Sequence, residues 1–126
     1  MKDQLTILNL YDLTTTAEAF CTAITALVDR VEQDGHQGVK RYRFFVDAAA
    51  GKARAVIDYD NAAAWIGHHD IAMDWPEMMA LHAVATLEEI TFLGANTPEI
   101  RQWIAGSALR ARIVEGNRFV AGFERG

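Results

Sequence analysis

The sequence predicts an α+β fold of the ferredoxin-like βαββαβ type, with an antiparallel sheet followed by a short helix and a strand-like extension. Short apolar or β-branched runs alternate with longer stretches in which apolar residues recur at helical spacing. Two of the short runs flank the turn-forming segment 47–52, which is typical of a β-hairpin. A chain of 126 residues also has the length of a single domain. We therefore expect one domain over residues 1–126, with its core in residues 3–94 and an extension in residues 95–126.

The first part of the core is predicted to contain a strand and a helix. Residues 5–10 are an apolar run that is too short for a helix and suits a strand. Residues 15–18 have the form of a capping box, in which Thr15 accepts from backbone donors and Glu18 reaches back. The helix behind them has one apolar face and ends at Gly35. That face consists of Phe20, Ile24, Leu27, Val28 and Val31.

A hairpin and two helical segments are predicted next. The hairpin pairs residues 39–46 with residues 53–59, both rich in aromatic and β-branched residues. Asp60 or Asn61 is suited to cap the following helix, and Gly67 within that helix weakens it. A second helical segment starts at Pro76, because proline is tolerated in the first turn of a helix.

The last third is predicted to contain a final core strand and then the extension. Residues 86–93 form the strand, and residues 97–104 form a short helix that Gly106 closes. Two strand-like pieces follow at residues 109–114 and 118–123, and residues 115–117 between them suit a turn.

Composition limits the kinds of partner. With 12 basic and 17 acidic residues the net charge is −5, which argues against nucleic-acid binding because phosphates require a clustered basic face. The single cysteine, Cys21, allows neither an internal disulfide nor a cysteine metal cage, and it is expected to be a small buried residue of a helix. No apolar run approaches the roughly 18–20 residues of a membrane span, and no signal segment opens the chain. We expect a soluble cytoplasmic protein that does not contact membranes.

Several runs resemble one family. They are residues 42–45 (Tyr-Arg-Phe-Phe), 59–68, 87–94, 97–100 and 119–123. In type and order they are similar to the antibiotic-biosynthesis-monooxygenase-like group of the dimeric α+β barrel superfamily. The resemblance implies a four-stranded antiparallel sheet with its helices on one face, and a homodimer in which two subunits pack sheet against sheet.

The resemblance also implies a set of functions. Members include cofactor-independent oxygenases of phenols and quinols, haem-degrading enzymes, and proteins without an assigned activity. The leading expectation is a small-molecule pocket, and within it a cofactor-free monooxygenase of an aromatic or quinol substrate. The alternative is a non-catalytic ligand-binding or accessory domain, because a shared fold does not transfer a reaction.

Three helical residues are the candidates for catalysis. Asn61 and Trp65 are four residues apart and therefore share a helix face. Family members hold the substrate oxygen with Asn and Trp side chains, and this pair is similar in type. The physical reason is that an amide and an indole N–H stabilise negative charge on a phenolate oxygen. The alternative is that Asn61 caps the helix and Trp65 fills the core. His68 is the candidate base, since the imidazole pKa lies near working pH. Its alternative is a hydrogen-bonded structural histidine.

The remaining candidates would shape an aromatic pocket. Met and Trp side chains suit flat guests, although stripes of them are more often ordinary core. The candidate substrate-binding residues are Asn9, Tyr42, His69, Met73, Trp75, Met78 and His82. No metal site is expected, because the run of His68, His69 and Asp70 with a remote His82 has no recognised chelating spacing. In the haem-degrading members Asn9 has a counterpart, but His68 and Met78 stand where those members have Trp and His.

Overall fold

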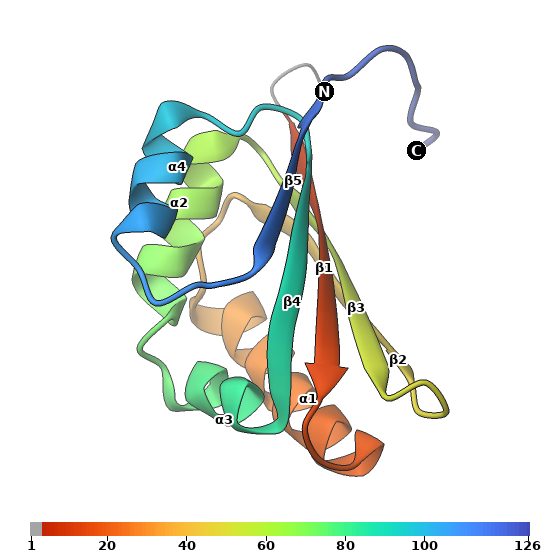
Figure 1. Cartoon of the computed structure of the whole chain (residues 1–126). Coiled ribbons are helices and arrows are strands. Elements are labelled where there is room, and N and C mark those ends of the chain that lie inside the picture. Colours follow the sequence, from red (N-terminus) through yellow and green to blue (C-terminus); the bar gives the residue numbers. More distant parts are fainter. Residues whose placement is uncertain (1–3) are drawn as a thin grey trace.

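Five strands form one mixed sheet, and four helices cover one of its faces in the computed structural model, which describes residues 4–126 (Figure 1). Asp3, the first residue of the predicted core, lies outside the described residues. The strands are β1 (Leu5–Leu13), β2 (Val39–Asp47), β3 (Lys52–Tyr59), β4 (Ala85–Leu93) and β5 (Arg112–Asn117). The helices are α1 (Ala17–Asp34), α2 (Ala62–Ala72), α3 (Pro76–Val84) and α4 (Pro98–Ala105). The predicted α+β class and βαββαβ order are confirmed.

The sheet has the strand order β2-β3-β1-β4-β5, and its first four strands are antiparallel. β1 lies between β3 and β4, as the ferredoxin-like topology requires. This strand extends to Leu13, three residues beyond the predicted end. The extension is stabilised on the side away from the helices, where Asp12 pairs with Lys52 at the neighbouring position of β3. The alternation of apolar and polar faces therefore continues past the apolar run that the sequence showed.

The prediction for the extension was partly wrong. A single strand, β5, includes residues 115–117, which were expected to form a turn, while residues 118–123 form no strand. β5 pairs in parallel with β4, from Glu89 opposite Arg112 onwards. Parallel neighbours require a crossover connection, and α4 provides it. The sheet is therefore mixed, rather than the four-stranded antiparallel sheet that the resemblance implied.

The helix starts follow capping chemistry. Thr16, and not Thr15, caps α1 by accepting from the Ala19 N–H at 3.0 Å. Asn61 caps α2 through its Oδ1, and Thr97 caps α4 through its Oγ1. The residue before Pro76 has extended backbone and provides no side-chain cap for α3.

Gly67 does not interrupt α2, although it was expected to weaken this helix. A Cβ at this position would lie 2.4 Å from Cδ2 of His36, whose ring packs directly over the glycine. The glycine therefore allows the loop before β2 to approach the helix closely. Cys21 was expected to be buried but is exposed on the outer face of α1. Its neighbour Phe20 occupies the core position instead.

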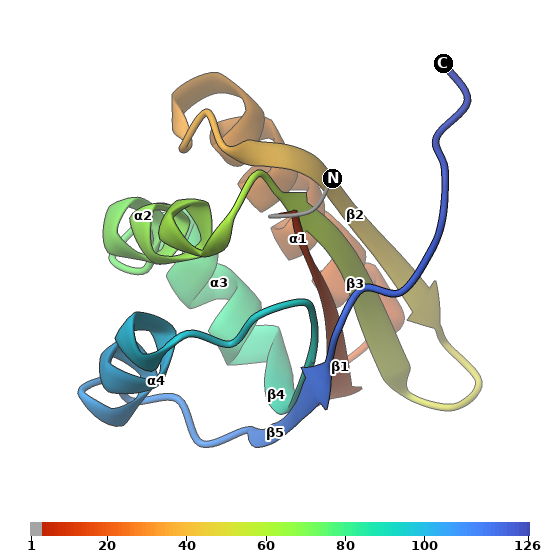
Figure 2. The same ribbon diagram turned by 90° about the horizontal axis from the view of Figure 1, so that it is seen from above.

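The other face of the sheet carries no helix (Figure 2). Leu8 of β1, Phe45 of β2 and Leu93 of β4 point to this side and are 36%, 55% and 40% exposed. Residues 118–126 leave β5 as an extended tail that crosses this face near the ends of the strands. We call this side of the sheet the open face. None of the helices within residues 4–126 is long and apolar enough to span a bilayer.

Candidate functional site

A small closed cavity lies between the sheet and the two helices α2 and α3, with a volume of about 40 Å³. It has room for a molecule of roughly the size of water, and it is too small for an aromatic ring. Strands β1, β2, β3 and β4, helices α2 and α3, and the connection before β5 all contribute side chains. The lining residues are Ile7, Asn9, Tyr11, Tyr42, Ile57, Tyr59, Trp65, His68, His69, Met73, Met78, Leu81, His82, Leu87, Ile90 and Leu109.

All but two of the candidate residues meet at this cavity. Asn9 and Tyr42 reach it from the sheet, and the others reach it from α2, its C-terminal end and α3. The latter are Trp65, His68, His69, Met73, Met78 and His82. The packing of α2 and α3 against the sheet thus brings together residues that lie up to about seventy positions apart in the sequence.

Asn61 and Trp75 lie elsewhere. The Asn61 side chain is exposed, and its Oδ1 accepts from the Ala64 N–H at 2.9 Å. It is therefore occupied as a helix cap, and it does not line the cavity in which we expected it to hold a substrate oxygen. Trp75 lies beneath the Arg30 guanidinium, whose carbon is 4.3 Å from the ring centroid. This cation–π contact joins the start of α3 to α1.

His68 is a deeply buried polar group of the site. Its side chain is 2% exposed and packs edge-on against Tyr42, with ring centroids 5.4 Å apart. Nδ1 is buried and has no hydrogen-bond partner within residues 4–126. Burial, and secondarily the nearby His69 and His36, lower the pKa of His68 to about 3. The imidazole is therefore neutral at pH 7 and presents an unused nitrogen.

His69 is fixed by its neighbour on the preceding turn. Its Nδ1 lies 2.7 Å from the backbone oxygen of Trp65, and its ring stacks on the Trp65 indole at a centroid distance of 3.9 Å. Because a carbonyl only accepts, Nδ1 carries the proton and Nε2 has the lone pair. Burial lowers the pKa of His69 to about 4, against the opposing effects of the Trp65 carbonyl and Asp70. His69 is thus a second neutral imidazole.

Tyr11 and Tyr59 also line the cavity, and we did not identify them from the sequence. Burial raises the pKa of Tyr11 to about 12 and raises the pKa of Tyr59 and Tyr42 above the ordinary value. Their hydroxyls therefore keep their protons at pH 7. One signal for Tyr11 was present, because it lies two positions from Asn9 and so faces the same side of β1. Asn9 donates from Nδ2 to the Tyr11 hydroxyl at 3.3 Å.

The site is therefore uncharged at neutral pH and rich in hydrogen-bonding groups. Besides His68 Nδ1, the Oδ1 of Asn9 is buried without a partner within the described residues. An unpaired acceptor in a buried site costs roughly 1–3 kcal/mol, so a ligand that donates hydrogen bonds would remove this cost. A charged ligand would gain no counter-charge there. Within residues 4–126 no three His, Cys, Asp or Glu side chains form a group that could hold a metal ion.

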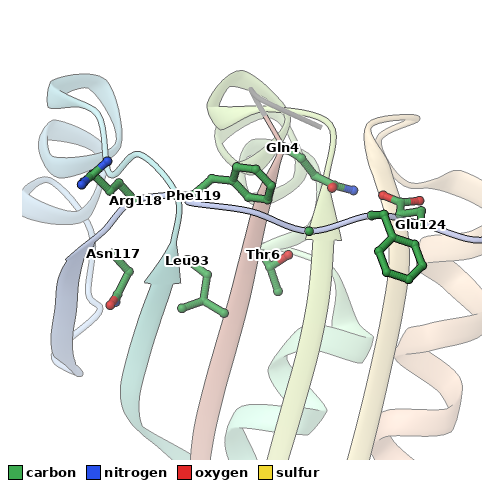
Figure 3. A pocket seen from close by; sticks show the side chains of 10 residues that line it. Gln4, Thr6, Leu93, Asn117, Arg118, Phe119 and Glu124 are labelled. Atoms are coloured by element: carbon green, nitrogen blue, oxygen red, sulfur yellow. The ribbon is translucent and has the colours of Figure 1, made fainter.

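Two wider hollows lie at the tail, and Figure 3 shows the smaller one, where the tail crosses the open face. Their volumes are about 300 and 900 Å³, and their walls include Thr6, Leu93, Asn117 and Phe119. None of the candidate residues is among their lining residues. They are open to solvent and have no buried polar group with a perturbed pKa, whereas the cavity combines burial with neutral titratable groups. The cavity is therefore the better candidate for chemistry.

Comparisons with known proteins identify the fold. No protein-family model matches the sequence, and a sequence comparison with curated proteins finds no match. Among solved structures, MupZ from Pseudomonas fluorescens superposes with a TM-score of 0.75 at 14% identity, over 99% of this chain and 91% of MupZ. This match includes the α4 and β5 extension.

Two further structures resemble the core. SnoaB from Streptomyces nogalater, a cofactor-independent oxygenase, superposes with a TM-score of 0.62 at 16% identity, over 75% of this chain and 95% of SnoaB. A Caulobacter crescentus protein provisionally described as an antibiotic biosynthesis monooxygenase gives 0.57 at 13% identity, over 76% and 92%. At these identities the likeness concerns the backbone arrangement. The chain therefore has the ferredoxin-like α+β fold of the antibiotic biosynthesis monooxygenase-like proteins, as its sequence runs predicted.

Proposed function

We propose that this protein binds an uncharged phenol or quinol in the cavity and oxidises it with molecular oxygen, without a cofactor. The observation that carries the proposal is His68, a 2% exposed neutral imidazole whose Nδ1 is unpaired inside the cavity. SnoaB, which has the same fold, is a cofactor-independent oxygenase. The proposal extends that likeness of fold to a likeness of chemistry, and it requires direct testing.

The first step is removal of a proton from the substrate. His68 Nδ1 accepts the proton of the substrate hydroxyl, and the resulting imidazolium and aryl oxide stabilise each other as an ion pair in the low dielectric of the cavity. Because the pKa of His68 is lowered to about 3, an imidazolium without a counter-charge is not stable in the cavity at neutral pH. His68 therefore holds the proton only while the substrate oxyanion lies beside it. The protonated hydroxyls of Tyr11, Tyr42 and Tyr59 are donors available to the same oxyanion. In this mechanism they take the role that the sequence suggested for Asn61.

The second step is oxidation by oxygen. The electron-rich anion transfers an electron to O₂, and the resulting radical pair combines to a peroxide anion on a ring carbon. This anion takes the proton back from the His68 imidazolium and becomes a hydroperoxide. The hydroperoxide then loses water. One oxygen atom of O₂ stays in the product, and the other leaves as water together with two hydrogens that came from the substrate. The substrate supplies all the electrons, so the protein contributes proton transfer, charge stabilisation and exclusion of water.

Oxygen uptake tests the reaction. We expect the protein to consume O₂ with one or more members of a panel of hydroquinones and polycyclic phenols, without added metal or flavin. His68→Phe keeps the ring volume but removes the base, so kcat should fall by about 10²–10⁴-fold. Asn61→Ser keeps a capping oxygen and should leave the rate within about twofold. Absence of uptake with the whole panel, or an unchanged rate in His68→Phe, would remove the proposal.

The small volume of the cavity supports a second candidate, a ligand-binding domain without catalysis. A space of about 40 Å³ is far below the roughly 300–1,000 Å³ of typical small-molecule sites, so the cavity has to widen before it can hold a phenol or quinol. The same panel separates the candidates. Saturable binding that depends on His68 but brings no oxygen uptake would establish the binding function.

We further propose that the open face is the contact between two copies of the chain. It presents Leu8, Phe45 and Leu93, and several of its charged groups are paired with one another. Asp58 accepts from Thr6 Oγ1 at 2.6 Å and from Arg41 Nε at 2.8 Å, and Arg112 pairs with Glu89. A face that combines exposed apolar side chains with paired charges of this kind suits burial against another protein surface.

Sedimentation tests this homodimer. The wild-type chain should sediment with twice the 14.0 kDa of one chain. Leu8→Glu places an unpaired charge in the contact, so the dissociation constant should rise by at least about 10²-fold. Met79→Glu is the control, because Met79 is 64% exposed but lies on α3, on the helix side of the sheet. A monomeric wild type, or equal effects of the two substitutions, would contradict the proposal.

A further inference from the structure

A second hollow adjoins the cavity on its outer side. Its volume is about 290 Å³, and we call it the vestibule. Its lining residues are Met73, His82, Ala85, Thr86, Leu87, Ala108, Leu109 and Arg110. Four of them, Met73, His82, Leu87 and Leu109, line the cavity as well, so they form the wall between the two spaces. Joined, the two spaces exceed the roughly 300 Å³ at which small-molecule pockets begin.

Leu109 is the part of this wall with the weakest attachment. It belongs to the connection 106–111 between α4 and β5, and pairing of β5 with β4 starts only at Arg112. The Leu109 N–H donates to Ser107 Oγ at 3.2 Å, and Ser107 Oγ in turn donates to the Ile104 backbone oxygen at 2.7 Å. Arg110 donates to the backbone oxygens of Ser107 and Leu109.

All of these hydrogen bonds stay within residues 104–110. In the described part of the chain, none joins this connection to the core strands or to α2 and α3. Two partly buried side chains of the connection, Leu109 and Ala111, pack against the core, and of these only Leu109 lines the cavity. Displacement of Leu109 therefore breaks apolar contacts and no side-chain hydrogen bond to α2, α3 or the core strands, whereas Leu87 is fixed in β4 and His82 in α3.

The remaining wall residue, Met73, is also able to yield. It is the C-cap residue of α2, at the start of the turn that leads to α3. Methionine has three rotatable bonds and adapts its shape to a neighbour. Leu109 and Met73 are thus the adjustable residues between the vestibule and the cavity.

The two ends of the joined space differ in chemistry. The inner end holds two unpaired polar atoms, the acceptor Asn9 Oδ1 and the ring nitrogen His68 Nδ1, which call for a hydroxyl group and disfavour charge. The outer end is mainly apolar, with Thr86, His82 and Arg110 near solvent. A ligand that fills both must therefore be elongated, uncharged and apolar, with a hydroxyl at its inner end.

We propose that Leu109 is a specificity-determining gate, and that the substrate is an elongated uncharged aromatic molecule of at least two rings. When Leu109 and Met73 move aside, the hydroxyl-bearing ring occupies the space that they vacate and places its hydroxyl at Asn9 and His68, while the remainder lies in the vestibule. This inference rests on the proposed function for the identity of the site, and it adds the shape of the substrate and its route of access.

Stopped-flow binding of 4-hydroxybiphenyl tests the gate. Leu109→Ala removes most of the plug, so the association rate constant should rise about tenfold, and Leu109→Trp should lower it by a similar factor. Met79→Ala, an exposed substitution on α3, should leave it unchanged. 4-Methoxybiphenyl has the same shape without the donor, and its equilibrium affinity for the wild type should be at least tenfold weaker.

The outcomes separate this inference from the proposed reaction. Gate-dependent binding without oxygen uptake leaves the gate standing and removes the oxygenase. Equal association rates in wild type, Leu109→Ala and Leu109→Trp overturn the gate, even where oxygen uptake is observed. Equal affinities for 4-hydroxybiphenyl and 4-methoxybiphenyl, or no binding to the wild type and Leu109→Ala, overturn the assigned substrate class.

Discussion

Acidification from pH 6.5 to pH 4 is expected to lower the free energy of unfolding by about 3 kcal/mol through His68 alone. Its imidazole has a pKa near 6.5 in the unfolded chain and about 3 in the folded protein. Below pH 6.5 the unfolded chain therefore binds a proton that the folded chain does not, so protons favour unfolding. The stabilisation is complete above pH 6.5 and is lost as the pH falls toward 3. His69, with a pKa of about 4, adds to the loss over the same interval.

Urea unfolding at closely spaced pH values measures this effect. The comparison of wild type with His68→Phe is decisive, because other titrating groups contribute to both proteins and cancel in the difference. Below pH 6.5 the wild-type curve should fall more steeply, by up to about 1.4 kcal/mol per pH unit. At pH 7 the variant should be at least as stable as the wild type, since it removes a buried unpaired nitrogen. Parallel curves for the two proteins between pH 6.5 and 4 would show that His68 is not buried and neutral in the folded state.

The fold was predictable from local patterns because its core obeys them. The face of α1 is apolar at helical spacing, and the 39–59 hairpin has turn residues between two β-rich runs, so local sequence and tertiary packing agree. The extension was not predictable in the same way. The parallel pairing of β5 depends on the α4 crossover and on the free edge of β4, neither of which leaves a pattern in residues 112–117. A turn of Glu115, Gly116 and Asn117 was a reasonable local prediction that the tertiary contact overrode.

The candidate site was predictable in composition but not in geometry. His68 and His69 are adjacent in the sequence, and neighbouring positions of a helix point about 100° apart. Both line the cavity, because the space continues around α2 from the Tyr42 side to Trp65. Asn61 shows the opposite case. It lies at the start of a helix, and its side-chain oxygen accepts a hydrogen bond from the helix backbone instead of facing a ligand. Tyr11 and Tyr59 were missed because buried tyrosines look like ordinary core residues in a sequence.

The site also explains an apparent inconsistency of the core. A fold of this size gains nothing from burying a neutral imidazole and an unpaired amide oxygen beside well-packed aromatic rings. Apolar residues of the same volume would be more stable there. Retention of such groups in a buried space is typical of a site that binds something, because the ligand satisfies what the protein leaves open. Trp65 lines this polar cavity and also packs in the apolar core, so its truncation should change both the volume of the cavity and the stability of the core.

Trp65→Ala is expected to cost about 3–5 kcal/mol of the free energy of unfolding, the range for truncation of a large buried aromatic side chain. Trp65 is 1% exposed, stacks on His69, and meets Trp103 edge-on at 5.4 Å between ring centroids. Its loss joins a new void to the existing cavity. Indole has the shape of the missing group, so at about 100 times its dissociation constant it should restore roughly 2.7 kcal/mol.

Trp103→Ala provides the matched control for this rescue. Trp103 is only partly buried, and its indole N–H donates to Asp70 at 2.8 Å near the surface. Its truncation should cost about 1–2 kcal/mol, and indole should have no effect because solvent fills the vacated space. Urea unfolding of both variants with and without indole distinguishes an internal void from a surface notch. A loss below about 1 kcal/mol in Trp65→Ala, or equal rescue of both variants, would mean that Trp65 does not close the cavity, since an enclosed void beside His69 requires both a large cost and a selective guest.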